Sequence, residues 1–161
     1  MKIKILTTGG TIDKIYFDEL STFQVGDSQI GEVLRQARVA FDYEVIPLLR
    51  KDSLELTDSD RQLIRDRIAN DPHDRWLVTH GTDTMTVTGI ALKGIPGKTI
   101  VLTGSMTPVR FRESDAIFNL GFALATAQLQ PTGVYIAMNG QVYDPATVYK
   151  NRELSRFDIR V

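Results

Sequence analysis

The stretch KIKILTTGGTI at residues 2–12 is the clearest indication of the fold in this sequence. Its first half is a short apolar run, typical of a buried strand, and its second half is a turn with two adjacent glycines. Such a turn is sharp and lets a ligand approach the bare backbone. The hydroxyl of Thr11 follows at once. We therefore expect a strand that presents functional groups at its carboxyl end.

Four further runs resemble this strand, and polar or Gly-rich sequence follows each of them. The five predicted strands are Lys2–Thr7, Tyr43–Leu49, Arg75–His80, Thr99–Thr103 and Gly133–Met138. Most are continuously apolar rather than alternating, which is typical of strands that are covered on both faces. The strands are therefore expected to lie in the interior of the domain.

Helical patterns lie between these strands. One covers Ser28–Val39, one begins at a Thr57 cap with Asp60 three residues on and ends near Asn70, and one covers Glu113–Gln128. The second has an apolar stripe of Leu63, Ile64 and Ile68. The third has one stripe of Ile117, Leu120, Gly121 and Leu124 and another of Phe118, Phe122 and Ala125, so we expect it to be well buried.

Strands that alternate with helices predict an α/β fold, a doubly wound, mostly parallel five-stranded sheet with helices on both faces, of the flavodoxin-like or Rossmann-like kind. The 161 residues are expected to form a single domain, residues 1–161. In this architecture ligands bind beyond the carboxyl ends of the strands, where the strand order reverses.

Composition restricts the function classes. The formal net charge is −1 and the cations are scattered, so we expect no binding to nucleic acid or to an anionic membrane. A small molecule is the expected partner. With no Cys and two His, the sequence predicts neither a metal site nor another cofactor. The N-terminus runs straight into strand sequence without a secretory signal, so we expect a cytoplasmic location.

Two more turns stand where strands end, HGTDTM at residues 80–85 and LTGSMTP at residues 102–108. Each turn alone has an ordinary interpretation: a Gly-Gly turn with a capping Thr, a Thr-Asp helix cap, or a loop that only shapes a pocket. Three such turns at the same edge of a parallel sheet would, however, meet in one cleft. This convergence favours an active site.

The blocks TGGTI at residues 8–12, VTHGTDT at 78–84 and VLTGSM at 101–106 closely resemble the signature blocks of the bacterial-type L-asparaginase/glutaminase family. The resemblance continues through SDA at 114–116 and FNL at 118–120 and reaches Lys150. It implies an amidohydrolase that converts L-asparagine to L-aspartate and ammonia through a threonyl acyl-enzyme, with weak glutaminase activity also open.

The resemblance also implies roles for individual residues. Thr11 matches the nucleophile, and Thr82, Asp83 and Lys150 match a deeper group that activates it; a buried Lys amine can take a proton. Lys150 could instead be an ordinary exposed lysine. The implied substrate-binding residues are Gly10, Ser53, Gly81, Thr82 and Asp83. Asp83 would receive the substrate ammonium and Ser53 its carboxylate, although Ser53 could equally be a turn residue.

The sequence departs from the family pattern in two places. Phe23-Gln24-Val25-Gly26 stands where longer members carry Tyr-Thr-Val-Gly, so Tyr16, in an expected lid at Asp13–Thr22, is the candidate for the catalytic phenol. Tyr16 could also simply pack at the surface. Longer members have a second, C-terminal domain, so we expect a short single-domain form that assembles into a homodimer or higher homo-oligomer.

Two other functions remain open. The same fold could serve as the amide-activating subunit of a tRNA-dependent amidotransferase, or as an amino-acid-binding module without turnover.

Overall fold

The computed structural model describes residues 1–17 and 22–160. It has a central sheet with the strand order β4-β1-β5-β6-β7-β8. These strands are β1 (Lys2–Gly9), β4 (Asp42–Lys51), β5 (Arg75–Thr79), β6 (Thr99–Thr103), β7 (Gly133–Met138) and β8 (Gln141–Tyr143). The first five in that order pair in parallel and correspond to the five predicted strands. The predicted α/β class is therefore confirmed, with an unpredicted sixth strand, β8, antiparallel to β7.

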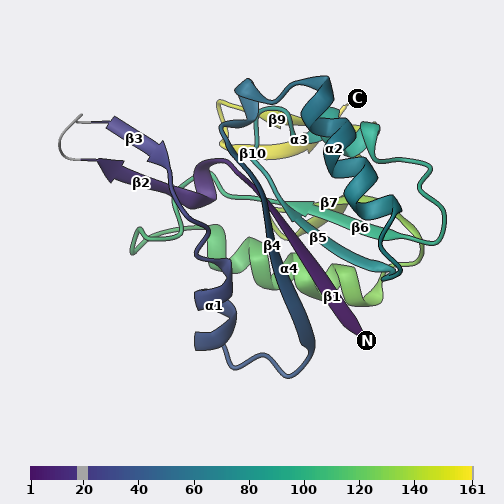
Figure 1. Cartoon of the computed structure of the whole chain (residues 1–161). Helices are drawn as coiled ribbons and strands as arrows, with labels where there is room; N and C mark the ends of the chain where they lie inside the picture. Colours follow the sequence, from purple (N-terminus) through teal and green to yellow (C-terminus); the bar gives the residue numbers. More distant parts are fainter. Residues whose placement is uncertain (18–21, 161) are drawn as a thin grey trace.

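Helices cover both faces of this sheet (Figure 1). On one face lie α1 (Ile30–Gln36) and α4 (Ala116–Leu129), and on the other lie α2 (Asp58–Ala69) and α3 (Met85–Ala91). Successive strand residues point to opposite faces, so Leu77 joins the α1 and α4 core while Trp76 and Val78 join the α2 and α3 core. None of the described helices is long and apolar enough to cross a lipid bilayer.

Two small hairpins were not predicted. One pairs β2 (Lys14–Phe17) with β3 (Thr22–Val25) and projects from the body of the molecule (Figure 1). The other pairs β9 (Val148–Asn151) with β10 (Arg156–Ile159) and contributes the buried Val148 and Phe157 to the core beneath α2 and α3. Short strands of this kind carry too few residues to give a readable period.

The α2 helix begins as predicted. Thr57 accepts a hydrogen bond from Asp60 N and the Asp60 carboxylate accepts one from Thr57 N, which forms a complete capping box. The predicted apolar stripe is wrong at Leu63, which is 46% exposed, whereas Ile64 and Ile68 are fully buried. The core-facing side includes the aliphatic part of Arg61 instead, and its guanidinium reaches Asp58 and Thr88.

The prediction that the 113–128 helix is well buried is also wrong. Its core face, which includes Leu120, Ala123 and Leu124, packs on the sheet. One residue of each predicted stripe fails to reach the core, because Ile117 is 61% and Phe118 62% exposed. The Phe118 ring stacks on Phe122, which is partly buried against the core. A helix on the outer layer of a sheet can bury only one side, and no other described element covers the second.

Asn119 fixes α4 to the strand ends beside it. This fully buried side chain donates to the Gly104 carbonyl at 3.1 Å and to the Asp115 carboxylate at 3.0 Å. Its carbonyl accepts from Asn139 N, just after β7, at 3.1 Å. A single amide thus joins the loop after β6 to the turn after β7.

Replacing Asn119 with Ala should lower the free energy of unfolding by about 2–4 kcal/mol, because it orphans the buried Gly104 carbonyl and the partly buried Asn139 N–H. The change can be measured as a shift in the urea midpoint at constant m. Gln128→Ala, on the same helix, is the control and should cost less than about 0.5 kcal/mol. Equal midpoints for the two variants would show that the Asn119 bonds do not hold the loops.

Candidate active site

The turns after β1, β4 and β5 pack directly against one another. Gly10 has φ 88°, and a Cβ added to it would lie 2.4 Å from Gly81 N. A Cβ on Gly81 would in turn lie 2.6 Å from Ser53 Oγ. No side chain fits at either position without pushing the loops apart. The three predicted binding residues Gly10, Gly81 and Ser53 are therefore brought together.

Hydrogen bonds fix the same loops from either side. Gly10 N donates to Lys51 O at 3.0 Å, and His80 N donates to Thr103 O at 2.9 Å. The buried Thr8 hydroxyl donates to Thr79 O at 2.9 Å. The order β4-β1-β5 shows that the strand order reverses at β1, so this cluster lies where doubly wound sheets bind ligands.

Thr11 begins a 3₁₀ turn, Thr11–Asp13, and its side chain is half-buried. It lines a cavity of about 260 Å³. The other lining residues are Lys14, Phe23, Met106, Thr107, Pro108 and Phe111. The residue predicted as the nucleophile thus lines a concave surface that a small molecule can enter.

Asp83 and Lys150 meet, although they lie far apart in the sequence. Asp83 Oδ1 accepts from Lys150 Nζ at 3.0 Å and also from Arg152 at 2.8 Å. The Lys150 side chain is 20% exposed, so it is partly buried and paired with Asp83, a member of the same predicted group. Thr82, next to Asp83 in the chain, is buried. The Arg152 contact was not anticipated.

Ser53 carries an unusual hydroxyl. The residue is 1% exposed, and its Oγ has no hydrogen-bond partner among the described residues. Its carbonyl accepts from Thr84 Oγ1 at 2.7 Å, which joins the loop after β4 to the turn after β5. A buried hydroxyl without a partner costs about 1–3 kcal/mol, and such groups are often kept where a ligand completes the bond.

Tyr16 lies on the β2–β3 hairpin, directly opposite Phe23. Its ring packs edge-on against Phe23 with centroids 5.4 Å apart, and it is about half exposed. Phe23 lines the cavity beside Thr11, and Tyr16 does not. Within the expected lid Asp13–Thr22, residues 18–21 lie outside the described part of the chain. The catalytic role of Tyr16 stays a prediction.

His80 is a functional candidate that sequence reasoning passed over. Its fully buried ring lies 2.7 Å from Gly81 O through Nδ1 and 2.8 Å from Thr88 Oγ1 through Nε2. Burial lowers the pKa of His80 to about 4, so the imidazole is neutral at pH 7. Since Gly81 O can only accept, Nδ1 carries the proton and holds the turn before Thr82 in place.

Asp13 is the second such residue. It is buried, its Oδ1 accepts from Gln29 N at 3.3 Å, and its Oδ2 has no partner among the described residues. Burial raises the pKa of Asp13 to about 6, against the opposing effect of a hydrogen bond from Ser28. An acidic residue two positions after Thr11, directly behind an apolar Ile12, was the available sequence signal.

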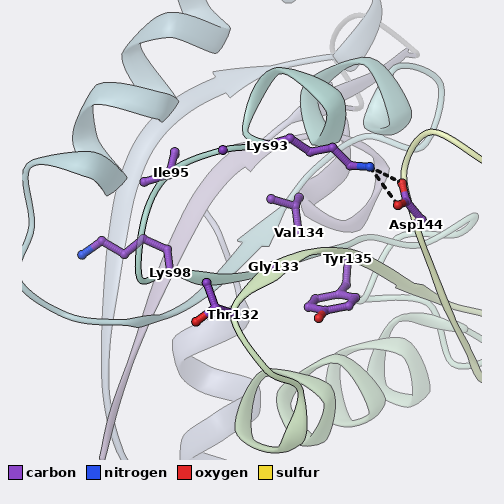
Figure 2. Close-up of a pocket in the computed structure, with 9 residues that line it drawn as sticks. Lys93, Ile95, Lys98, Thr132, Gly133, Val134, Tyr135 and Asp144 are labelled. Atoms are coloured by element: carbon purple, nitrogen blue, oxygen red, sulfur yellow. Dashed lines mark hydrogen bonds and ion pairs between the residues drawn. The ribbon is translucent and has the colours of Figure 1, made fainter.

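A larger cavity, of about 410 Å³, lies at the opposite edge of the sheet (Figure 2). It is lined at the amino-terminal ends of β6 and β7 by Lys98 and Gly133, and Lys93 and Asp144 form an ion pair of 2.6 Å across it. None of the predicted site residues lines it. In residues 1–17 and 22–160, no group of three His, Cys, Asp or Glu is arranged to hold a metal ion.

Comparison with known proteins agrees with this geometry. Residues 2–158 match the family model "Asparaginase, N-terminal". The L-asparaginase of Thermococcus kodakarensis is 33% identical over 152 residues, which cover 88% of this chain and 45% of that protein. L-asparaginase 2 of Escherichia coli is 29% identical, over 92% of this chain and 46% of that protein.

Solved structures give the same result. The thermostable L-asparaginase from Thermococcus kodakarensis superposes with a TM-score of 0.85 at 30% identity, over 99% of this chain and 51% of that chain. L-asparaginase I from Vibrio cholerae also gives 0.85, at 28% identity, over 98% and 51%. The chain thus spans about half the length of the relatives it matches. With its turns at the strand-order reversal and these matches over nearly all of its length, the chain belongs to the asparaginase family and corresponds to the family's N-terminal domain.

Proposed function

We propose that this chain carries the active site of an amidohydrolase that converts L-asparagine to L-aspartate and ammonia. One observation carries the proposal: the contact of Gly10 with Gly81 and of Gly81 with Ser53 gathers the loops at one edge of the sheet, with Thr11 on a cavity there. Membership of a family whose named relatives are L-asparaginases supports amide hydrolysis.

In the proposed reaction the Thr11 hydroxyl oxygen attacks the amide carbon. The carbon–nitrogen bond breaks, the nitrogen leaves as ammonia with the hydroxyl proton, and water then hydrolyses the ester on Thr11. A Thr hydroxyl needs a group that takes its proton. We assign this task to Thr82 with Asp83 and Lys150, helped by Tyr16 if the hairpin brings its phenol closer.

Recognition of the substrate follows its two charges. Asp83 would bind the ammonium of asparagine, in competition with Lys150 and Arg152, which occupy the same carboxylate oxygen. The unpartnered Ser53 hydroxyl would donate to the substrate carboxylate. Backbone N–H groups near Thr11 and Thr82 would stabilise the oxyanion that forms on the carbonyl.

Two alternatives stay open and one assay separates them. A glutamyl-tRNA(Gln) amidotransferase component from Aeropyrum pernix is 37% identical over 84 residues, 48% of this chain and 19% of that protein. Ammonia release from free asparagine or glutamine by the purified chain alone favours the amidohydrolase and reports any glutaminase activity. Stabilisation by asparagine without ammonia release favours a binding module, and activity only with a partner favours the amidotransferase alternative.

The expected homo-oligomer is part of the same proposal. The exposed side of α4 offers a surface for it, because this helix has no charged residue and exposes Ile117 and Phe118. A two-fold pair of such uncharged faces would bury apolar surface without bringing like charges together.

Thr11→Val should abolish turnover by about a thousandfold or more while the fold is kept, because it removes the attacking oxygen and little volume. Thr82→Val should cost about a hundredfold or more, and the double variant should be only slightly worse than Thr11→Val. Ammonia release measures all three. Thr126→Val, a buried Thr on α4, is the matched control and should stay active. Additive losses would mean that Thr11 and Thr82 do not act together.

Lys150→Met should lower turnover by about a hundredfold while changing the free energy of unfolding by less than about 1 kcal/mol. The stability effect is small because the Lys150–Asp83 pair is partly exposed and Arg152 remains on Asp83. Lys93→Met removes a comparable ion pair at the other edge of the sheet and is the control. If both variants keep similar activity, Lys150 has no part in the relay.

Asp13→Asn should change how stability depends on pH. The pKa of Asp13 rises from 3.8 to about 6 on folding, so between these values the folded chain binds more protons and stability falls as pH rises. The stability difference, variant minus parent, should therefore grow by up to about 3 kcal/mol from pH 4 to pH 7. Urea unfolding at several pH values measures it, with exposed Asp42→Asn as control. A pH-independent difference would contradict this role of burial.

A further inference from the structure

The cavity beside Thr11 has mainly apolar walls. Phe23 of the hairpin and Met106, Pro108 and Phe111 of the loop after β6 surround the Thr11 side chain. Free asparagine, which carries two charges and an amide, has no group that such walls would bind. The cavity therefore suits a substrate that carries an additional apolar group.

The polar groups on these walls are already engaged within the protein. Met106 N and Thr107 N donate to the Asp115 carboxylate at 2.9 and 3.1 Å, and the Thr107 hydroxyl donates to it at 3.0 Å. Lys14 Nζ pairs with Asp52 at 2.7 Å. The Thr11 hydroxyl is thus the polar side-chain group left to meet a ligand among the described lining residues.

An exposed aromatic row continues the cavity outward. The Phe23 ring lies between Tyr16 and Phe111, with centroid distances of 5.4 and 5.8 Å. All three rings are about half exposed. Adjacent exposed aromatic rings beside a reactive group are typical of a surface that binds a ligand.

The positions of the loops indicate which end of the substrate enters the cavity. Ser53 follows β4 and Asp83 follows β5, the strands on either side of β1, whereas the cavity lies between Thr11, the hairpin and the loop after β6. If the α-carboxylate and ammonium lie on Ser53 and Asp83 and the amide carbon lies on Thr11, the amide nitrogen points toward the cavity.

We propose that this site hydrolyses secondary amides, namely β-amides of L-aspartate whose nitrogen carries a small aromatic or alkyl group. This inference rests on the proposed function and extends its substrate class. The Thr11 oxygen forms an ester with the β-carbonyl carbon, the carbon–nitrogen bond breaks, and the hydroxyl proton leaves with the nitrogen as an apolar primary amine. Water then hydrolyses the ester to aspartate and free Thr11.

The test measures aspartate release by the full chain from L-asparagine and from the β-benzylamide of L-aspartate. The benzylamide should show a kcat/KM at least about tenfold higher than that of asparagine. Its ring would be transferred from water into contact with the aromatic side chains of the cavity, which stabilises the bound substrate and transition state. Phe111→Ala should lower the ratio of benzylamide to asparagine kcat/KM by about tenfold, and Phe23→Ala should lower it in the same direction. Phe118→Ala, which removes an exposed Phe from α4, should leave the ratio within about twofold.

The outcomes separate the two proposals. Hydrolysis of asparagine without hydrolysis of the benzylamide, or a ratio that Phe111→Ala and Phe23→Ala do not lower, overturns the extended substrate class and leaves the asparaginase proposal standing. Release of aspartate from neither substrate overturns both. A higher rate with the benzylamide that depends on both Phe residues and on Thr11 supports the inference.

Discussion

The contact of Gly10 with Gly81 is the constraint on which the rest of the site depends. Here the backbones that leave the adjacent strands β1 and β5 pack closely, since a Cβ on Gly10 would meet Gly81 N at 2.4 Å. The sheet order brings β1 and β5 side by side, and the glycines let their turns close together beyond the last paired residues. Ser53 then packs on Gly81, so loops from three strands form one continuous surface.

That surface holds polar groups at a cost to stability. The buried hydroxyl of Ser53 and one oxygen of the Asp13 carboxyl have no partner among the described residues, and His80 is kept neutral by burial. Each of the two unpartnered oxygens lowers stability by an amount comparable to a lost hydrogen bond. Such groups cluster at sites that bind and react, because there a ligand or a proton can complete them. Their concentration at the carboxyl edge of the sheet agrees with the proposed site.

The chain is polar on the inner side of Thr11 and apolar on the outer side. Asp83, Lys150 and Ser53 gather where the charged end of an amino acid would bind, while Phe23 and Phe111 line the cavity beyond Thr11. The Phe23 ring forms a wall of this cavity and can supply no proton. Specificity would then be determined by the hairpin and the loop after β6, which are not part of the central sheet.

The sequence by itself determined the five parallel strands, the Thr57 cap and the Gly-Gly turn, because local period, capping chemistry and backbone freedom are properties of neighbouring residues. It also identified Thr11, Thr82, Asp83 and Lys150 as candidates through their place after strands and the family blocks. Only the tertiary structure decided that Phe118 and Leu63 are exposed, that Arg152 shares Asp83, and that Asp13 and His80 are buried. Burial and pairing depend on which distant segments the fold brings together. The periodicity of one segment does not indicate which other segments will pack against it.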